Sequence, residues 1–185
     1  MEPHHLITDR WSPVAFDERE VEIEKIESLF KAAMWAPSSR NMQPWRFIYV
    51  SKSHADYQSA FDLLVEGNKT WAITAPVLAI SIAETISGYK NRSNYYAIYD
   101  TGMAVCNMLL QATHLGLFVH QMGGYDMERA RVVFKIPDRF EPIAMMAIGY
   151  KGDPAVLPES EASREKGKRI RNDMSEHLFE GSWGM

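Results

Sequence analysis

The stretch of this chain best suited to hold a ligand is a polar loop within A-P-S-S-R-N-M-Q-P-W-R-F, residues 36–47. Pro37 ends the amphipathic segment before the loop, and Pro44 closes it. Between these prolines the loop offers hydroxyl and amide side chains and free backbone amides, from Ser38, Ser39, Asn41 and Gln43. The residues alone support a binding surface and an ordinary connection between a helix and a strand about equally.

Two further stretches carry cations. Arg10 and Ser12 lie two residues apart, just before a predicted helix. The stretch R-E-K-G-K-R-I-R, Arg164–Arg171, has five cations and one anion in a chain whose net charge is −4. Arginines neutralise a phosphate through paired hydrogen bonds, so an anion site is one interpretation. The alternatives are a solvated arginine beside a turn serine and a solvated basic tail.

Asn68 and the pair Gly123-Gly124 are the remaining candidates. Gly123 and Gly124 follow a predicted strand that ends at Met122, and they precede a predicted helix. Two glycines there let the backbone approach a planar ligand with its amides free, although a tight turn explains them equally well. Asn68, in G-N-K-T-W-A, is either a ligand contact or a helix C-cap.

These stretches, in their order, resemble the nitroreductase family of FMN-dependent oxidoreductases. The similarity is carried by P-S-S-x-N-x-Q-P-W-x-F after a helix, by Asn68 with Trp71, by the glycine pair, by the R-x-R at Arg169 and Arg171, and by the closing F-E-G-x-W-G. Arg10, Ser12 and Phe16 match the family pattern R-x-S-x-R/K-x-F, and Val14 departs from it. The resemblance covers nearly all 185 residues.

The resemblance implies an FMN site in which arginines and Ser12 hold the phosphate and the glycine pair lies against the flavin ring. The implied cofactor-binding residues are Arg10, Trp11, Ser12, Pro37, Ser38, Ser39, Asn41, Gln43, Asn68, Met122, Gly123, Gly124, Arg169 and Arg171. Because backbone amides would stabilise charge on the reduced ring, no catalytic side chain is assigned. Because position 14 carries valine in place of the family's cation, one of the contacts to the phosphate is expected to be missing.

The same resemblance implies an enzyme that passes electrons from NAD(P)H to a small acceptor such as a nitroaromatic or a quinone. It also implies a homodimer with two FMN sites at the interface, each lined by both chains. The alternatives are a flavin-binding or flavin-less protein without turnover, and a flavin enzyme of this fold with other chemistry, such as dehalogenation or flavin fragmentation.

Hydrophobic periodicity and turn residues predict the elements. Helices are expected over residues 18–35, 53–66, 95–114 and from a cap at Asp126 to 134, and strands over 47–50, 76–83, 117–122 and 143–150. The predicted class is α+β, with a mixed central sheet of about four strands flanked by helices. We expect one nitroreductase-like domain over 1–185, in which about 151–185 form an extended arm that docks on the partner subunit.

Composition excludes several other classes. The hydrophobic fraction of 46% and the charged fraction of 24% are typical of a globular protein, and no apolar run approaches the roughly 18 residues of a membrane span. The N-terminus has no signal-peptide pattern, so a cytoplasmic location is expected. The negative net charge argues against a nucleic-acid partner, no metal-ligand spacing occurs, and the single cysteine, Cys106, is expected to be buried.

Overall fold

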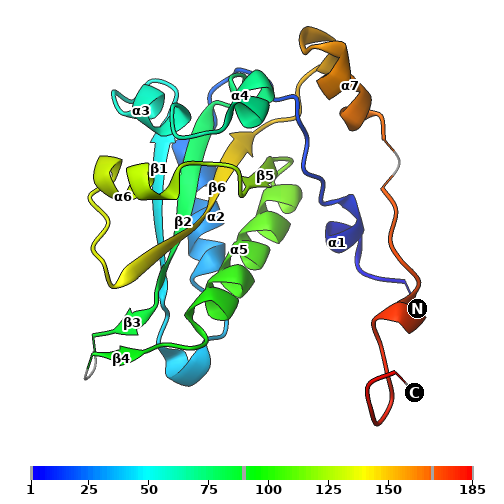
Figure 1. The fold of residues 1–185 in the computed structure, drawn as a ribbon. Helices are drawn as coiled ribbons and strands as arrows, with labels where there is room; N and C mark the ends of the chain where they lie inside the picture. Colours follow the sequence, from blue (N-terminus) through cyan, green and yellow to red (C-terminus); the bar gives the residue numbers. More distant parts are fainter. Residues whose placement is uncertain (1, 89–90, 168, 185) are drawn as a thin grey trace.

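A four-stranded sheet forms the centre of the chain in the computed structural model, which describes residues 2–88, 91–167 and 169–184 (Figure 1). The strand order is β1-β2-β6-β5, with bounds Trp45–Ser51, Val77–Glu84, Phe140–Gly149 and Phe118–Met122 respectively. The predicted α+β class with helices around one sheet is confirmed. All three pairings in this sheet are antiparallel, where the sequence led us to expect a mixed one.

Strand β2 is buried on both faces because helices cover both sides of the sheet. Its side chains alternate between two apolar clusters, as the two-residue period of a strand requires. Leu78 and Ile80 belong to the cluster beneath α3 (Tyr57–Phe61), α4 (Glu66–Ala72) and α6 (Met127–Val133). Val77 and Ala79 belong to the cluster beneath α2 (Ile23–Ala33) and α5 (Ala97–His114). The continuous apolar run that predicted a buried strand is thereby explained.

Two predicted helices differ from the observed ones. The helix expected from residue 18 begins only at Ile23, because the backbone of its N-cap, Glu22, is extended (φ −60°, ψ 135°). Asp17 instead forms a local turn outside the helix, in which its carboxylate accepts a hydrogen bond from the Arg19 amide. The helix expected over 53–66 is instead α3, a break, and α4, and Gly67 lies inside α4. The break has a tertiary cause: the Leu63 carbonyl accepts from the Asp126 amide at 2.8 Å, which takes this segment out of the helical pattern.

Most other elements lie where the sequence predicted them. Helix α5 is followed by Gly116, whose φ of 71° suits a glycine after a helix. Asp126 caps α6 by accepting from the Arg129 amide at 2.9 Å. Cys106, expected to be buried within α5, is exposed. Part of α5 is therefore exposed to solvent in the single chain.

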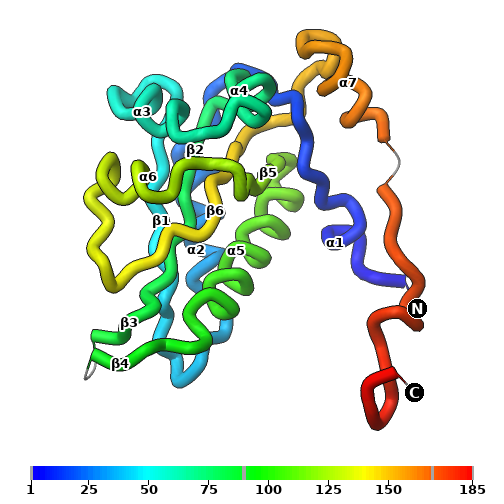
Figure 2. The backbone as a smooth tube through the Cα atoms, in the orientation of Figure 1, coloured from blue at the N-terminus to red at the C-terminus, as the bar shows by residue number. Residues whose placement is uncertain are grey.

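The two ends of the chain lie side by side, away from the sheet (Figure 2). The N-terminal helix α1 spans His5–Asp9, and the C-terminal region contains η2 (Pro154–Val156), α7 (Glu159–Glu165) and η3 (Met174–Glu176). A short hairpin of β3 (Ile86–Ser87) and β4 (Arg92–Ser93) projects from the end of the sheet that lies away from α3 and α4 (Figure 1). The C-terminal segment leaves large apolar side chains exposed, among them Ile170, Met174, Leu178 and Trp183.

Candidate functional site

Three arginines from opposite ends of the sequence gather beside α1. Arg169 donates to the carbonyl of Arg10 at 2.5 Å and also to that of Thr8, so the C-terminal segment is fastened to the N-terminal one. The pKa of Arg10 is lowered from its ordinary value, first by burial and then by the charges of Arg169 and Arg171. In the described part of the chain none of the three forms an ion pair with a carboxylate. Such unbalanced positive charge is suited to an anion.

Several separate hydrogen bonds hold the segment that begins at Arg10 in place. Arg10 donates to the Ser12 hydroxyl at 3.2 Å. The Trp11 indole N–H donates to Glu165 at 3.0 Å, and the Arg169 guanidinium carbon lies 5.8 Å from the centroid of the Trp11 ring. His120 lies 2.7 Å from the Pro13 carbonyl through Nδ1, and burial lowers its pKa. A largely neutral imidazole with its proton on Nδ1 therefore fixes the segment at Pro13.

The glycine pair after β5 contacts Asn68, a contact that the sequence did not predict. The Asn68 side-chain amide donates to the Gly124 carbonyl at 2.9 Å, so Asn68 is not a helix C-cap but lies in the first turn of α4. A Cβ added to Gly123 would meet no atom within 4 Å, so this face of the loop is open. Within the described residues neither the Gly123 nor the Gly124 amide donates to another backbone group. Both amides are therefore free to donate to a ligand, and Gly123 leaves open space for one.

Met122 lies at the end of β5 with its side chain in the core. It is 2% exposed and belongs to the cluster that contains Trp71. Trp71 is also buried, and its ring stacks on His120 with the ring centroids 4.3 Å apart. Its indole N–H has no hydrogen-bond partner among the described residues. Met122 can therefore serve a ligand through its backbone, whereas its side chain supports the fold.

The polar loop before β1 contains the 3-10 turn η1, Ser39–Asn41. Arg40, Asn41 and Gln43 all have positive φ, between 48° and 55°, which is uncommon for residues other than glycine. The loop is held from within by the Ser38 hydroxyl, which accepts from the Gln43 amide at 3.0 Å. Such strained backbone persists where the surroundings determine it, and it is frequent at ligand sites.

Asp100 anchors this loop to α5. It is 2% exposed, and its carboxylate accepts from the Ser39 amide at 3.0 Å. Neither Asp100 nor Glu165 was expected from the sequence as a site residue. The available signals were an acidic residue in an otherwise apolar helical pattern for Asp100, and the single anion of the basic stretch for Glu165.

The single chain does not bring the polar loop to the glycine pair. The loop enters β1 and the glycines leave β5, which are the two outer strands of the sheet. Two strands lie between them, so the separation across the sheet is about 14 Å. The loop also lies beyond one end of the sheet, since Trp45 pairs with Ala83 and Ala83 pairs with Glu141. Figure 1 shows the segment near residue 40 at the end of the molecule opposite α4.

Position 14 is not an empty phosphate position. Val14 is 3% exposed and packs in the core cluster that contains Phe16 and Trp71. Its backbone amide donates to Glu165 at 2.9 Å. The expectation that its side chain points toward the arginines is wrong, because the chain turns this side chain inward. Lys168 of the basic stretch lies outside the described residues.

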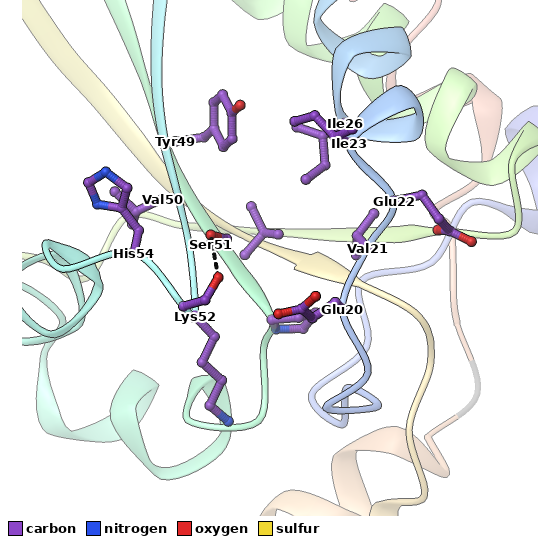
Figure 3. Close-up of a pocket in the computed structure, with 13 residues that line it drawn as sticks. Glu20, Val21, Glu22, Ile23, Ile26, Tyr49, Val50, Ser51, Lys52 and His54 are labelled. Carbon is purple, nitrogen blue, oxygen red and sulfur yellow. Dashed lines mark hydrogen bonds between the residues drawn. The ribbon is translucent and has the colours of Figure 1, made fainter.

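A cavity of about 680 Å³ lies elsewhere, between the start of α2 and the end of β1. Ile23, Ile26 and Tyr49 flank it, and Glu20 and Lys52 lie at its rim (Figure 3). The cavity contains none of the residues proposed from the sequence.

Among the described side chains, no group of three histidine, cysteine, aspartate or glutamate residues is placed to hold a metal ion. None of the described helices is both long and apolar enough to cross a membrane.

Comparison with known proteins assigns the family. The model of the Nitroreductase family matches residues 7–66 and 55–150. The chain is 35% identical over 122 residues to an uncharacterized 15.4 kDa protein of Mycolicibacterium smegmatis, which covers 66% of this chain and 80% of that protein. It is 28% identical to a protein of Archaeoglobus fulgidus provisionally named NADH dehydrogenase/NAD(P)H nitroreductase, over 80% of this chain and 84% of that one. The chain therefore belongs to the nitroreductase family.

Two other similarities concern cofactor and chemistry. A crystal structure described as that of an oxidoreductase containing FMN matches with a TM-score of 0.93 and 37% identity, over 99% of this chain and 93% of that one. An iodotyrosine deiodinase of Haliscomenobacter hydrossis is 25% identical over 78% of this chain and 77% of its own length. The first relationship extends over the whole fold described above.

Proposed function

We propose that this protein is an FMN-dependent oxidoreductase that passes electrons from NAD(P)H to a small acceptor such as a nitroaromatic or a quinone. The observation that carries the proposal is the cluster of Arg10, Arg169 and Arg171, which has no carboxylate partner in the described residues. Arginines bind phosphate oxygens through paired, charge-assisted hydrogen bonds, so a terminal phosphate suits this cluster. The similar structure that contains FMN supports the same cofactor.

The residues fit FMN at both of its ends. At the phosphate end, Arg169 uses two of its guanidinium N–H groups on backbone carbonyls, which leaves others for a phosphate oxygen. At the ring end, Gly123 faces open space, and the amides of Gly123 and Gly124 are free. A planar ring needs a close, flat backbone surface with donors, and this pair supplies one.

When bound, FMN supplies the hydride and electron chemistry that side chains cannot perform. The chain's own residues bind and orient it. The amides of Gly123 and Gly124 would donate to the ring edge and stabilise negative charge that develops there. Asn68 holds the Gly124 carbonyl at 2.9 Å and so keeps this backbone in place. No described side chain needs to act as an acid or a base in this scheme.

We further propose a homodimer in which the polar loop of one chain completes the site of the other. The support is the separation of this loop from the glycine pair across the sheet. Tyr95, Tyr96, Ile98 and Tyr99 at the start of α5 are all more than half exposed, and the C-terminal segment exposes further apolar side chains. Apolar patches of this kind mark interfaces. Within the arm over about 151–185, Glu165 and Arg169 contact the N-terminal segment of the same chain, so the exposed apolar side chains from Ile170 onward would be the part that docks on the partner subunit.

Flavin titration of the purified full chain tests the cofactor. Quenching of FMN fluorescence should saturate at about one FMN per chain, and Arg169→Met should weaken binding by about tenfold or more, since a charge-assisted hydrogen bond is lost. Arg129→Met is the matched control, because Arg129 is exposed on α6, away from the cluster. A chain that takes up no FMN, or one in which both variants behave alike, would reject this site.

The electron donor and acceptor need a separate experiment. Under exclusion of oxygen, NADH or NADPH should bleach the flavin absorbance, and a nitroaromatic or quinone should restore it. The deiodinase relative makes reductive dehalogenation a second candidate, tested by adding an iodinated phenol to the bleached protein. Release of iodide without reoxidation by quinones would favour that alternative. A loaded protein that neither nicotinamide bleaches would contradict the proposed donor.

A further inference from the structure

The Glu165 carboxylate at the end of α7 is buried among three donors. Its side chain is 3% exposed. One oxygen accepts from the Trp11 indole N–H at 3.0 Å and from the Lys151 ammonium at 2.8 Å. The other oxygen accepts from the Val14 amide at 2.9 Å. A carboxylate is costly to bury without partners, so this arrangement ties all four groups to one another.

These contacts connect the two segments that carry the arginine cluster. Trp11 follows Arg10 directly, and Glu165 precedes Arg169 by four residues. Residues 10–14 belong to no helix and to no strand ladder, so their position depends on side-chain contacts. His120 fixes Pro13 from one side, and Glu165 fixes Trp11 and Val14 from the other.

A plain surface ion pair between Glu165 and Lys151 would contribute little. Two of the three donors, however, are neutral N–H groups of the segment that presents Arg10 and Ser12. We propose that Glu165 is a positioning residue for phosphate recognition. It holds the segment that carries Arg10 close to Arg169, while its own carboxylate is occupied by hydrogen bonds from Trp11 and Val14 and by the ion pair with Lys151. This inference rests on the proposed FMN function and adds a residue that does not touch the cofactor.

Comparison of FMN with riboflavin tests it, because riboflavin lacks the phosphate. The full-length chain, freed of flavin, is titrated with each compound, and the ratio of the two dissociation constants is the readout. Glu165→Gln should weaken FMN by about tenfold, the effect of losing a charged hydrogen-bond partner, while riboflavin changes less than about twofold. Glu159→Gln removes the same charge from an exposed position at the start of α7 and should change neither.

A milder variant covers the case in which Glu165→Gln fails to fold. Trp11→Phe removes the indole N–H that reaches Glu165 but keeps an aromatic ring beside Arg169, and it should weaken FMN by roughly threefold with riboflavin unchanged. Equal losses for both flavins, or no loss of FMN affinity, would overturn the inference while the proposed function stands. An unsubstituted chain that binds no FMN would reject the proposed function, and the inference with it.

Discussion

The side-chain amide of Asn68 donates a 2.9 Å hydrogen bond to the carbonyl of Gly124, and this bond joins the start of α4 to the loop after β5. The Val65 amide donates to the same carbonyl at 3.1 Å. Both lone pairs of Gly124 are thus engaged on the α4 side, while its neighbour Gly123 faces open space. The two glycines therefore have different roles: Gly124 packs against Val65 and Asn68, whereas Gly123 leaves space for the proposed ligand.

Alanine substitutions should separate these roles. A Cβ at Gly124 would lie 2.9 Å from Val65 Cγ2 and 3.0 Å from Asn68 Nδ2, so Gly124→Ala should lower the free energy of unfolding by about 1–3 kcal/mol. Gly123→Ala should leave stability within about 1 kcal/mol but weaken FMN by about tenfold, since its methyl group enters the proposed ring space. Urea unfolding and flavin titration measure the two effects. The reverse pattern would contradict the assignment.

Asp100 should matter for the shape of the polar loop. Asp100→Ala leaves the Ser39 amide without its acceptor, and we expect a loss of about 1–3 kcal/mol in the free energy of unfolding. Asp100→Asn keeps an acceptor of the same size and should lose less. Urea denaturation of both variants at neutral pH gives the comparison. Equal losses would show that the charge, and not the hydrogen bond to Ser39, is what the loop requires.

Val14→Arg should damage the fold and should not strengthen flavin binding. The side chain at this position is 3% exposed in an apolar cluster, so an arginine there would be an unpaired buried charge that costs about 3–5 kcal/mol. Val14→Ile, which stays apolar, should cost less than about 3 kcal/mol. Thermal unfolding followed by circular dichroism distinguishes them. A stable Val14→Arg protein that binds FMN more tightly would restore the idea drawn from the sequence.

Stability should fall as the solution is made acidic, in part through His120. Burial holds the pKa of His120 below its ordinary 6.5; the hydrogen bond to the Pro13 carbonyl opposes this, Arg164 lowers the pKa further, and Glu165 raises it. The unfolded chain therefore takes up a proton before the folded chain does, so the free energy of unfolding decreases as pH falls below about 6.5. His120→Gln cannot titrate, so its melting temperature should depend less on pH between about 7.5 and 5.5. Identical pH dependence in both proteins would show that His120 is not responsible.

Much of the fold follows from local sequence. The apolar run of β2, the Asp126 cap and Gly116 after α5 each specify an element through the chemistry of neighbouring residues. The family and the arginines at positions 10, 169 and 171 were recognisable for the same reason, since short motifs stay together in sequence. The break between α3 and α4 was not, because the bond from the Asp126 amide to the Leu63 carbonyl joins residues far apart in the chain.

Only the tertiary structure decided which side chains face the arginines and which face the core. Val14 and Trp11 lie in a segment without helix or strand periodicity, so nothing in their spacing shows that one turns inward and the other reaches Glu165. Their directions come from contacts with α7 and His120, which the sequence does not place. The sequence by itself thus determined the class of chemistry and most elements, whereas the packing of the two chain ends against each other decided how the phosphate end of the proposed site is built.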